Sequence, residues 1–173
     1  GTDYQVSGKA LNGLVLLNTQ TASNSATVSF SSTYVSSVYR AYRVYIDNLV
    51  AATDANDLWM RVSQASSYIS SAYQWATFNN IVGTVTGSSS NNDTKIALTS
   101  DKDSVGNSAS YTSAFIVDIT GVATGISSRV TWTGVSLSSG GGSNSYVGAG
   151  GLSSTTIIDG IRFLMESGNI TSG

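Results

Sequence analysis

Residues 58–63 are Leu58-Trp59-Met60-Arg61-Val62-Ser63. In an extended chain this order places Leu58, Met60 and Val62 on one face and the other three residues on the opposite face, as in a strand with one side in the core. A second stretch, Tyr42-Arg43-Val44-Tyr45-Ile46-Asp47, combines alternation with the aromatic and β-branched residues that strands favour. Both stretches predict a half-buried sheet.

Further strand candidates recur at intervals of about ten to fifteen residues, separated by clusters of Gly, Ser, Asn and Asp. They are Leu14–Asn18, Ala26–Phe30, Tyr68–Thr77, Thr94–Leu98, Tyr111–Ile119, Ser128–Leu137 and Thr155–Met165. We expect surface loops at Gly87–Asp93 and Ser138–Asn144, and turns at the glycines of residues 148–151. This pattern predicts an all-β fold, an antiparallel and jelly-roll-like β-sandwich, with less than about a tenth of the residues in helix.

The length of 173 residues predicts a single domain, because a chain of this size can bury a sizeable core without disulfides or metal. No change of composition divides the chain, and no repeat of fixed period is present. We expect residues 1–14 to form an N-terminal arm or linker and residues 15–173 to form the β-sandwich.

The chain contains no His, no Cys and no Pro. Without His it lacks the usual general base near neutral pH, and without Cys it has no thiolate nucleophile or zinc-thiolate site. A serine nucleophile would have only Lys or Asp as its base. We therefore predict that the protein is not an enzyme and needs no cofactor.

Acidic residues suggest two kinds of chemistry, and a structural interpretation is favoured for both. Asp47 and Asp118 fall inside predicted strands, where an outward position on the polar face or pairing with Arg43 or Arg61 is a better expectation than a glycosidase-like carboxylate pair.

Oxygen-rich stretches are the second case, because calcium prefers oxygen ligands at alternating positions. Asp54, Asn56 and Asp57 are the calcium candidates, and Asn91–Asp93 and Asp101–Asp103 are similar in composition. None of these stretches has the full pattern of an EF-hand loop, so turn formation by Asp and Asn is the favoured interpretation.

Charge limits the partners of the protein. Eight Lys and Arg are scattered along the chain and the net charge is −2, so no basic footprint for nucleic acid exists. No apolar stretch approaches the roughly 20 residues that span a bilayer, and we predict no membrane insertion. Because charged residues are sparse, few of them are available to protect exposed strand edges from pairing with other chains. This favours a protein that works as a subunit of a larger assembly.

Aromatic residues gather in the first half of the chain and can serve as core, interface anchors or platforms for sugars. We expect about two-thirds of them to be core. Among the exposed remainder, Trp59, Tyr73 and Trp75 are the predicted contact residues for a ligand or partner.

Several segments in a fixed order resemble a module of tailed-bacteriophage virion proteins found in tail fibres, other tail proteins and related surface appendages. These segments are Thr19–Phe30, Tyr39–Leu49, Ala51–Leu58, Ile161–Phe163 and Ser167–Gly173, and the similarity extends over roughly residues 15–173. Such modules often carry Pro in the segment matching Val50–Asp54, and they commonly continue past the segment matching Gly173 into a final short strand. The resemblance thus implies an incomplete last strand here.

The resemblance implies a non-enzymatic structural component on the surface of a tailed-phage virion, either a tail fibre or appendage or a capsid decoration. Its expected partners are other virion proteins and further copies of itself, with a trimer as the expected homo-oligomer. Attachment to a host-surface glycan is a further expectation. The alternative is a secreted carbohydrate-binding module, for which exposed aromatic residues and polar loops would be the same signal.

Overall fold

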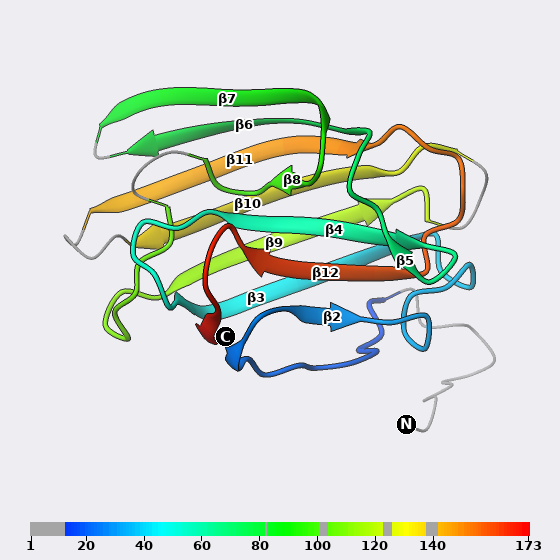
Figure 1. Ribbon diagram of the computed structural model, residues 1–173, viewed down its shortest axis with the longest axis horizontal. Coiled ribbons are helices and arrows are strands. Elements are labelled where there is room, and N and C mark those ends of the chain that lie inside the picture. The colour runs from blue at the N-terminus through cyan, green and yellow to red at the C-terminus, as the bar shows by residue number, and fades with distance from the viewer. Residues whose placement is uncertain (1–12, 82, 101–103, 123–125, 138–141) are drawn as a thin grey trace.

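The computed structural model describes residues 13–81, 83–100, 104–122, 126–137 and 142–173. Within these ranges all regular secondary structure is β, and no helix occurs. The strands form two antiparallel sheets, with the smaller one lying in front of the larger one in Figure 1. The prediction of an all-β antiparallel sandwich is confirmed.

The larger sheet has eight strands and the smaller has five. In spatial order the larger sheet consists of β1 (Ser23–Ser25), β13 (Ile170–Ser172), β3 (Ala41–Ala51), β9 (Ser113–Thr120), β10 (Arg129–Leu137), β11 (Ser143–Leu152), β6 (Tyr73–Ile81) and β7 (Thr84–Asp93). The smaller sheet consists of β2 (Val28–Phe30), β12 (Gly160–Met165), β4 (Leu58–Gln64) and β5 (Ser67–Tyr68), with β8 (Ile96–Ala97) paired to β4.

The core lies between the two sheets and follows the period of two. Leu58, Met60 and Val62 on β4 are fully buried, as the alternation in residues 58–63 predicts. From the larger sheet, Val117 and Trp132 face them across the same core cluster. Each such side chain contributes about 1.5–3 kcal/mol when it leaves water, so this layer is the main source of stability.

Two buried polar groups of the larger sheet also bind the backbone of the opposite layer. The Val62 N–H donates to the Tyr73 hydroxyl at 2.9 Å, and the Trp132 indole N–H donates to the Leu98 carbonyl at 2.8 Å. A buried donor without an acceptor would cost about 1–3 kcal/mol, so these contacts fix how the sheets lie on each other.

Glycines in β11 and β10 make room for aromatic rings in the core. A Cβ on Gly148 would lie 2.1 Å from the Trp132 ring, and one on Gly134 would lie 2.0 Å from the Phe115 ring. The expectation of turns at residues 148–151 is therefore wrong. Gly148 lies inside β11 beside the Trp132 ring, which leaves no space for a side chain, and a Cβ at Gly150 or Gly151 would meet backbone atoms of the neighbouring strand or loop.

The predicted loop at Gly87–Asp93 is also wrong, because these residues belong to the edge strand β7. β7 pairs with β6 along its length, and Gly83, at φ +87°, lies in the turn that connects them. Backbone hydrogen bonds hold this strand, and its side chains are mostly exposed, so the hydrophobic pattern gave no signal for it.

Two further strand predictions and one loop prediction need correction. Residues 14–18 form no strand: Leu14 and Leu16 are exposed and no strand pairs with this segment. The candidate at Thr155–Met165 is a strand only from Gly160 onward. The loop predicted at Ser138–Asn144 is wrong from Ser143 onward, where β11 begins. Residues 138–141 of this loop and residues 1–12 of the expected arm lie outside the described residues.

We predict that Gly148→Ala lowers the free energy of unfolding by about 1–3 kcal/mol, because the new methyl group would enter the space of the buried Trp132 ring. Urea unfolding followed by tryptophan fluorescence measures the change. The control is Ala149→Ser at the next, exposed position of β11, which should change stability by less than about 0.5 kcal/mol. Equal stability of the two variants would contradict this packing.

Candidate binding face

Apolar side chains are exposed on the outer face of the larger sheet, one from each of six neighbouring strands. In the order of the strands they are Tyr45 (β3), Ile116 (β9), Val135 (β10), Val147 (β11), Phe78 (β6) and Val85 (β7). Their exposed fractions lie between 38% and 73%. We call this set the apolar band.

The strand register places four members of the apolar band in one row and the other two in the adjacent row. Tyr45 lies opposite Ile116, and Val147 lies opposite Phe78, with Thr133 between these two pairs. Val135 and Val85 are each one row further along their strands. Because neighbouring strands are about 4.8 Å apart, the band crosses the sheet for roughly 24 Å.

A shallow hollow of about 570 Å³ lies in one half of the apolar band. Tyr45, Ile116 and Val135 line it, together with Thr133 and Gly134. The outer face thus offers both exposed apolar side chains and a recess beside them.

The sequence of β9 contains a signal for an apolar outer face. In β9, Phe115 and Val117 point into the core and Ile116 points outward, so the strand is apolar on both sides. Strands of this kind are typical of sheets that are covered on both faces.

An ion pair lies beside the apolar band on the same face. Arg43 and Asp118 are opposite each other in register, and two parallel contacts of 2.7 and 2.8 Å join the guanidinium to the carboxylate. The hydrogen bonds from Arg43 lower the pKa of Asp118. Of the alternatives that the sequence left open for Asp118, the structure shows the pair with Arg43. Because both side chains are more than a third exposed, the pair adds little stability.

A second, polar hollow of about 600 Å³ lies on the other side of the apolar band, toward the ends of β6, β10 and β11. Its polar lining includes Gln74, Asn91 and Arg129. Ala76 and Ala149 also line it, so two small side chains separate this polar end from the apolar band.

Two of the three aromatic residues predicted to be exposed are buried. Tyr73 is fully buried, and Trp75 is nearly so, because positions 73 and 75 share the inner face of β6 while Gln74 and Phe78 face outward. Burial raises the pKa of the Tyr73 hydroxyl to about 12. The expectation that these two side chains are exposed is therefore wrong, and the exposed aromatic ring of β6 is Phe78.

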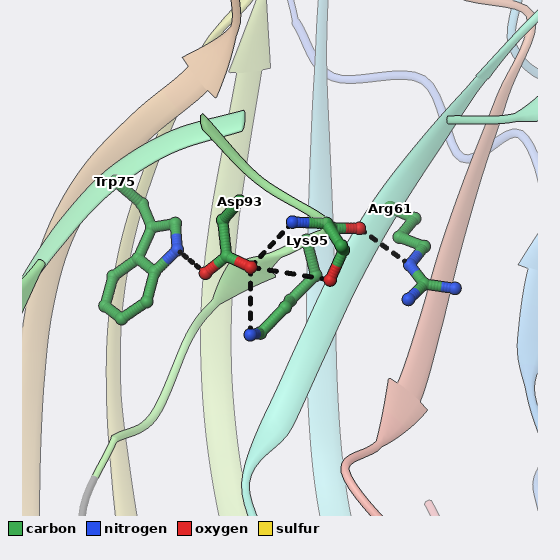
Figure 2. A network of polar contacts seen from close by, with 5 residues as sticks. Arg61, Trp75, Asp93 and Lys95 are labelled. Atoms are coloured by element: carbon green, nitrogen blue, oxygen red, sulfur yellow. Dashed lines mark hydrogen bonds and ion pairs between the residues drawn. The ribbon is translucent and has the colours of Figure 1, made fainter. Parts of the chain in front are cut away.

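Trp75 instead belongs to a polar network with Asp93, Lys95 and Arg61 that ties the two sheets together (Figure 2). The Asp93 carboxylate accepts hydrogen bonds from the Trp75 indole at 2.9 Å and from the Lys95 ammonium at 3.0 Å. Lys95 also lies over the half-buried Trp59 ring, 4.7 Å from its centroid. On the far side, Arg61 donates to the Thr94 carbonyl at 2.9 Å.

The calcium candidates are engaged in structural hydrogen bonds. The Asn56 amide bonds the backbone of Ser167, and Asp57 accepts hydrogen bonds from Thr99 and Ser104. Asp54 belongs to the same turn, in which Ala55 has a φ of +54°. Asp54 thus lies in a turn as expected, whereas Asn56 and Asp57 hold segments that are distant in the chain and do not form a turn with their own backbone.

Among the described residues, no group of three or more His, Cys, Asp or Glu side chains could hold a metal ion. Asp101–Asp103 lies outside those residues. In the same described part of the chain, no helix is long and apolar enough to cross a membrane.

Comparisons of the chain with models of protein families, with curated protein sequences and with solved structures found no match.

We predict that Asp93 makes stability depend on pH. Burial raises its pKa, but the hydrogen bonds from Lys95, Trp75 and the Thr94 N–H and the charge of Lys95 outweigh burial, so the pKa is lowered in the folded state. Because the pKa of Asp93 is lower in the folded state than in the unfolded chain, where it is about 3.9, the ionised carboxylate stabilises the fold at pH values above about 3.9. This stabilisation is lost as the pH falls through the pKa of the folded state.

Asp93→Asn should therefore cost about 1–3 kcal/mol at pH 7 and should reduce the loss of stability between about pH 5 and pH 2. Urea midpoints measured across this range provide the test. The control is Asp47→Asn, at an exposed residue whose side chain bonds only its neighbour Asn48, and it should keep the wild-type pH profile. A wild-type profile in Asp93→Asn would show that the network does not stabilise the fold.

Proposed function

We propose that this protein is a non-enzymatic structural subunit on the surface of a tailed-phage virion, and that the apolar band is its assembly contact. The band carries the proposal because six exposed apolar side chains on adjacent strands of one sheet face are unusual for a face that meets only water. In an assembled particle a neighbouring subunit would cover them.

Charge on this face supports a protein contact. Arg43 and Asp118 neutralise each other beside the band, so a partner would not have to desolvate an isolated charge there. The members of the band include Tyr45 and Phe78, and aromatic residues are enriched at protein interfaces. An exposed hydrophobic row beside a neutralised ion pair suits a stable interface.

The virion setting rests on the resemblance of segments such as Thr19–Phe30 and Tyr39–Leu49 to tailed-phage modules. In that setting the partners are other virion proteins and further copies of this chain, with a trimer as the proposed homo-oligomer. The protein would serve as a tail fibre, a tail appendage or a capsid decoration. The non-enzymatic role is supported by the lack of His and Cys in the sequence.

A secreted carbohydrate-binding module is the second candidate, and the polar hollow favours it. Gln74, Asn91 and Arg129 offer hydrogen-bond donors and acceptors on an open sheet face, where a saccharide could lie. The two candidates differ in what the apolar band does, because a monomeric binding module has no need of a subunit contact there.

We predict that the wild-type protein self-associates in solution, with a mass that is a higher multiple of the 17.9 kDa of one chain, and that Ile116→Lys weakens this association at least tenfold. The new ammonium would have to be buried against a neighbouring subunit, at a cost of several kcal/mol. Sedimentation equilibrium at several concentrations provides the measurement, and circular dichroism checks that the variant folds.

The matched control is Thr120→Lys, which adds the same charge on the same face of β9, four residues away from the band. It should leave the mass unchanged. A wild-type protein that stays monomeric at high concentration and is missing from purified phage particles would contradict the proposed function.

A further inference from the structure

We infer that the polar hollow on the outer face of the larger sheet binds an acidic saccharide, with the saccharide carboxylate on Arg129 and its hydroxyl groups on Gln74 and Asn91. This site goes beyond the proposed assembly role, because it uses side chains outside the apolar band. It would serve in attachment to a surface glycan.

The polar hollow has the size of a ligand site. The hollow has a volume of about 600 Å³, which lies within the range of roughly 300–1,000 Å³ that is usual for ligand sites and is much larger than a simple anion needs. Gly151 helps to form its floor, opposite Gln74 in the register. A Cβ at Gly151 would lie 2.1 Å from the Ser128 carbonyl oxygen, so the backbone itself keeps this floor bare.

Arg129 supplies the positive charge of the polar hollow. Among the described residues two ion pairs form, Arg43 with Asp118 and Lys95 with Asp93, and neither includes Arg129. Arg129 is exposed and donates one hydrogen bond, from Nη1 to the Ser127 carbonyl at 3.2 Å. Its remaining N–H groups form a planar fork, which fits a carboxylate through two parallel hydrogen bonds.

The amide groups of Gln74 and Asn91 line the hollow together with Arg129. Gln74 Nε2 donates to Asn91 Oδ1 at 2.8 Å, and this contact orients both amides across the β6–β7 pair. It leaves the Gln74 Oε1 acceptor and the Asn91 Nδ2 donor for a ligand. Adjacent hydroxyl groups of a sugar ring both donate and accept hydrogen bonds, so they match this pair of amides. The serine hydroxyls of Ser127 and Ser153 add further polar lining.

The distance from the polar hollow to the exposed Phe78 ring suits a ligand of more than one sugar. Phe78 lies four residues from Gln74 on the same face of β6, which corresponds to roughly 13 Å along the strand. Only Ala76 lies between them on this face, and the Phe78 ring is exposed. An oligosaccharide anchored at Arg129 could thus lay the apolar face of a later sugar ring on Phe78, where the hollow meets the apolar band.

Titration calorimetry of the full chain at low salt provides the test, with trigalacturonate and 3′-sialyllactose as acidic probes and maltotriose as the neutral probe. At least one acidic probe should bind about tenfold or more tightly than maltotriose. Arg129→Gln should weaken the acidic probe about tenfold or more, and Gln74→Ala should also weaken it. The matched control is Arg40→Gln, an exposed arginine that does not line the hollow, and it should bind as the wild type does.

Absence of binding by both acidic probes, or equal binding by wild type and Arg129→Gln, would overturn the inference. Inorganic phosphate is added as a competitor. If it displaces the acidic saccharide at equal concentration, the hollow is a general anion site and the saccharide assignment is wrong. Sedimentation of Arg129→Gln separates this site from the assembly role, because its mass should equal that of the wild type whether or not the saccharide binds.

Discussion

The whole structure depends on burying the facing sides of two sheets in one shared core. Trp132 shows how strict this constraint is. Its ring occupies the space that a side chain at position 148 would need, while its indole N–H bonds the Leu98 carbonyl of the opposite layer. Tyr73 makes a similar link to Val62. Close packing and hydrogen bonding act together here, so the two sheets have little freedom to shift against each other. The strands of the larger sheet, and the side chains on its outer face, are therefore held in fixed positions.

The outer face of the larger sheet then follows from the period of two. Because Phe115 and Val117 point into the core, Ile116 between them points outward. The register places Ile116 opposite Tyr45 on the neighbouring strand β3. The same rule puts Phe78 outward because Trp75 points inward. The apolar band is thus a consequence of strand register, whereas the polar hollow arises where outward side chains are small or missing, as at Gly151.

The aromatic residues show why composition alone is a poor guide to a binding surface. Tyr73, Trp75 and Trp59 all lie close together in the chain, yet two of them are buried and the third is covered in part by Lys95. Their polar atoms serve the fold, through Val62 for Tyr73 and through Asp93 for Trp75. The surface that remains for partners consists of apolar side chains such as Ile116 and of a hollow that no motif in the sequence marks.

The sequence by itself determined the β class and the two faces of residues 58–63, because these depend on local alternation. For Asp118 it left open an outward position or a pair with Arg43 or Arg61, since Arg43 and Asp118 are 75 residues apart in the chain and meet only through the pairing of β3 with β9. It did not reveal that residues 87–93 and 148–151 are strands, because backbone pairing and the bulk of distant rings decide those positions. Tertiary structure alone decided which face of β6 is buried and which strands are neighbours. A binding face assembled from six strands exists only after that order is set, since its members are separated in the chain and meet through the register.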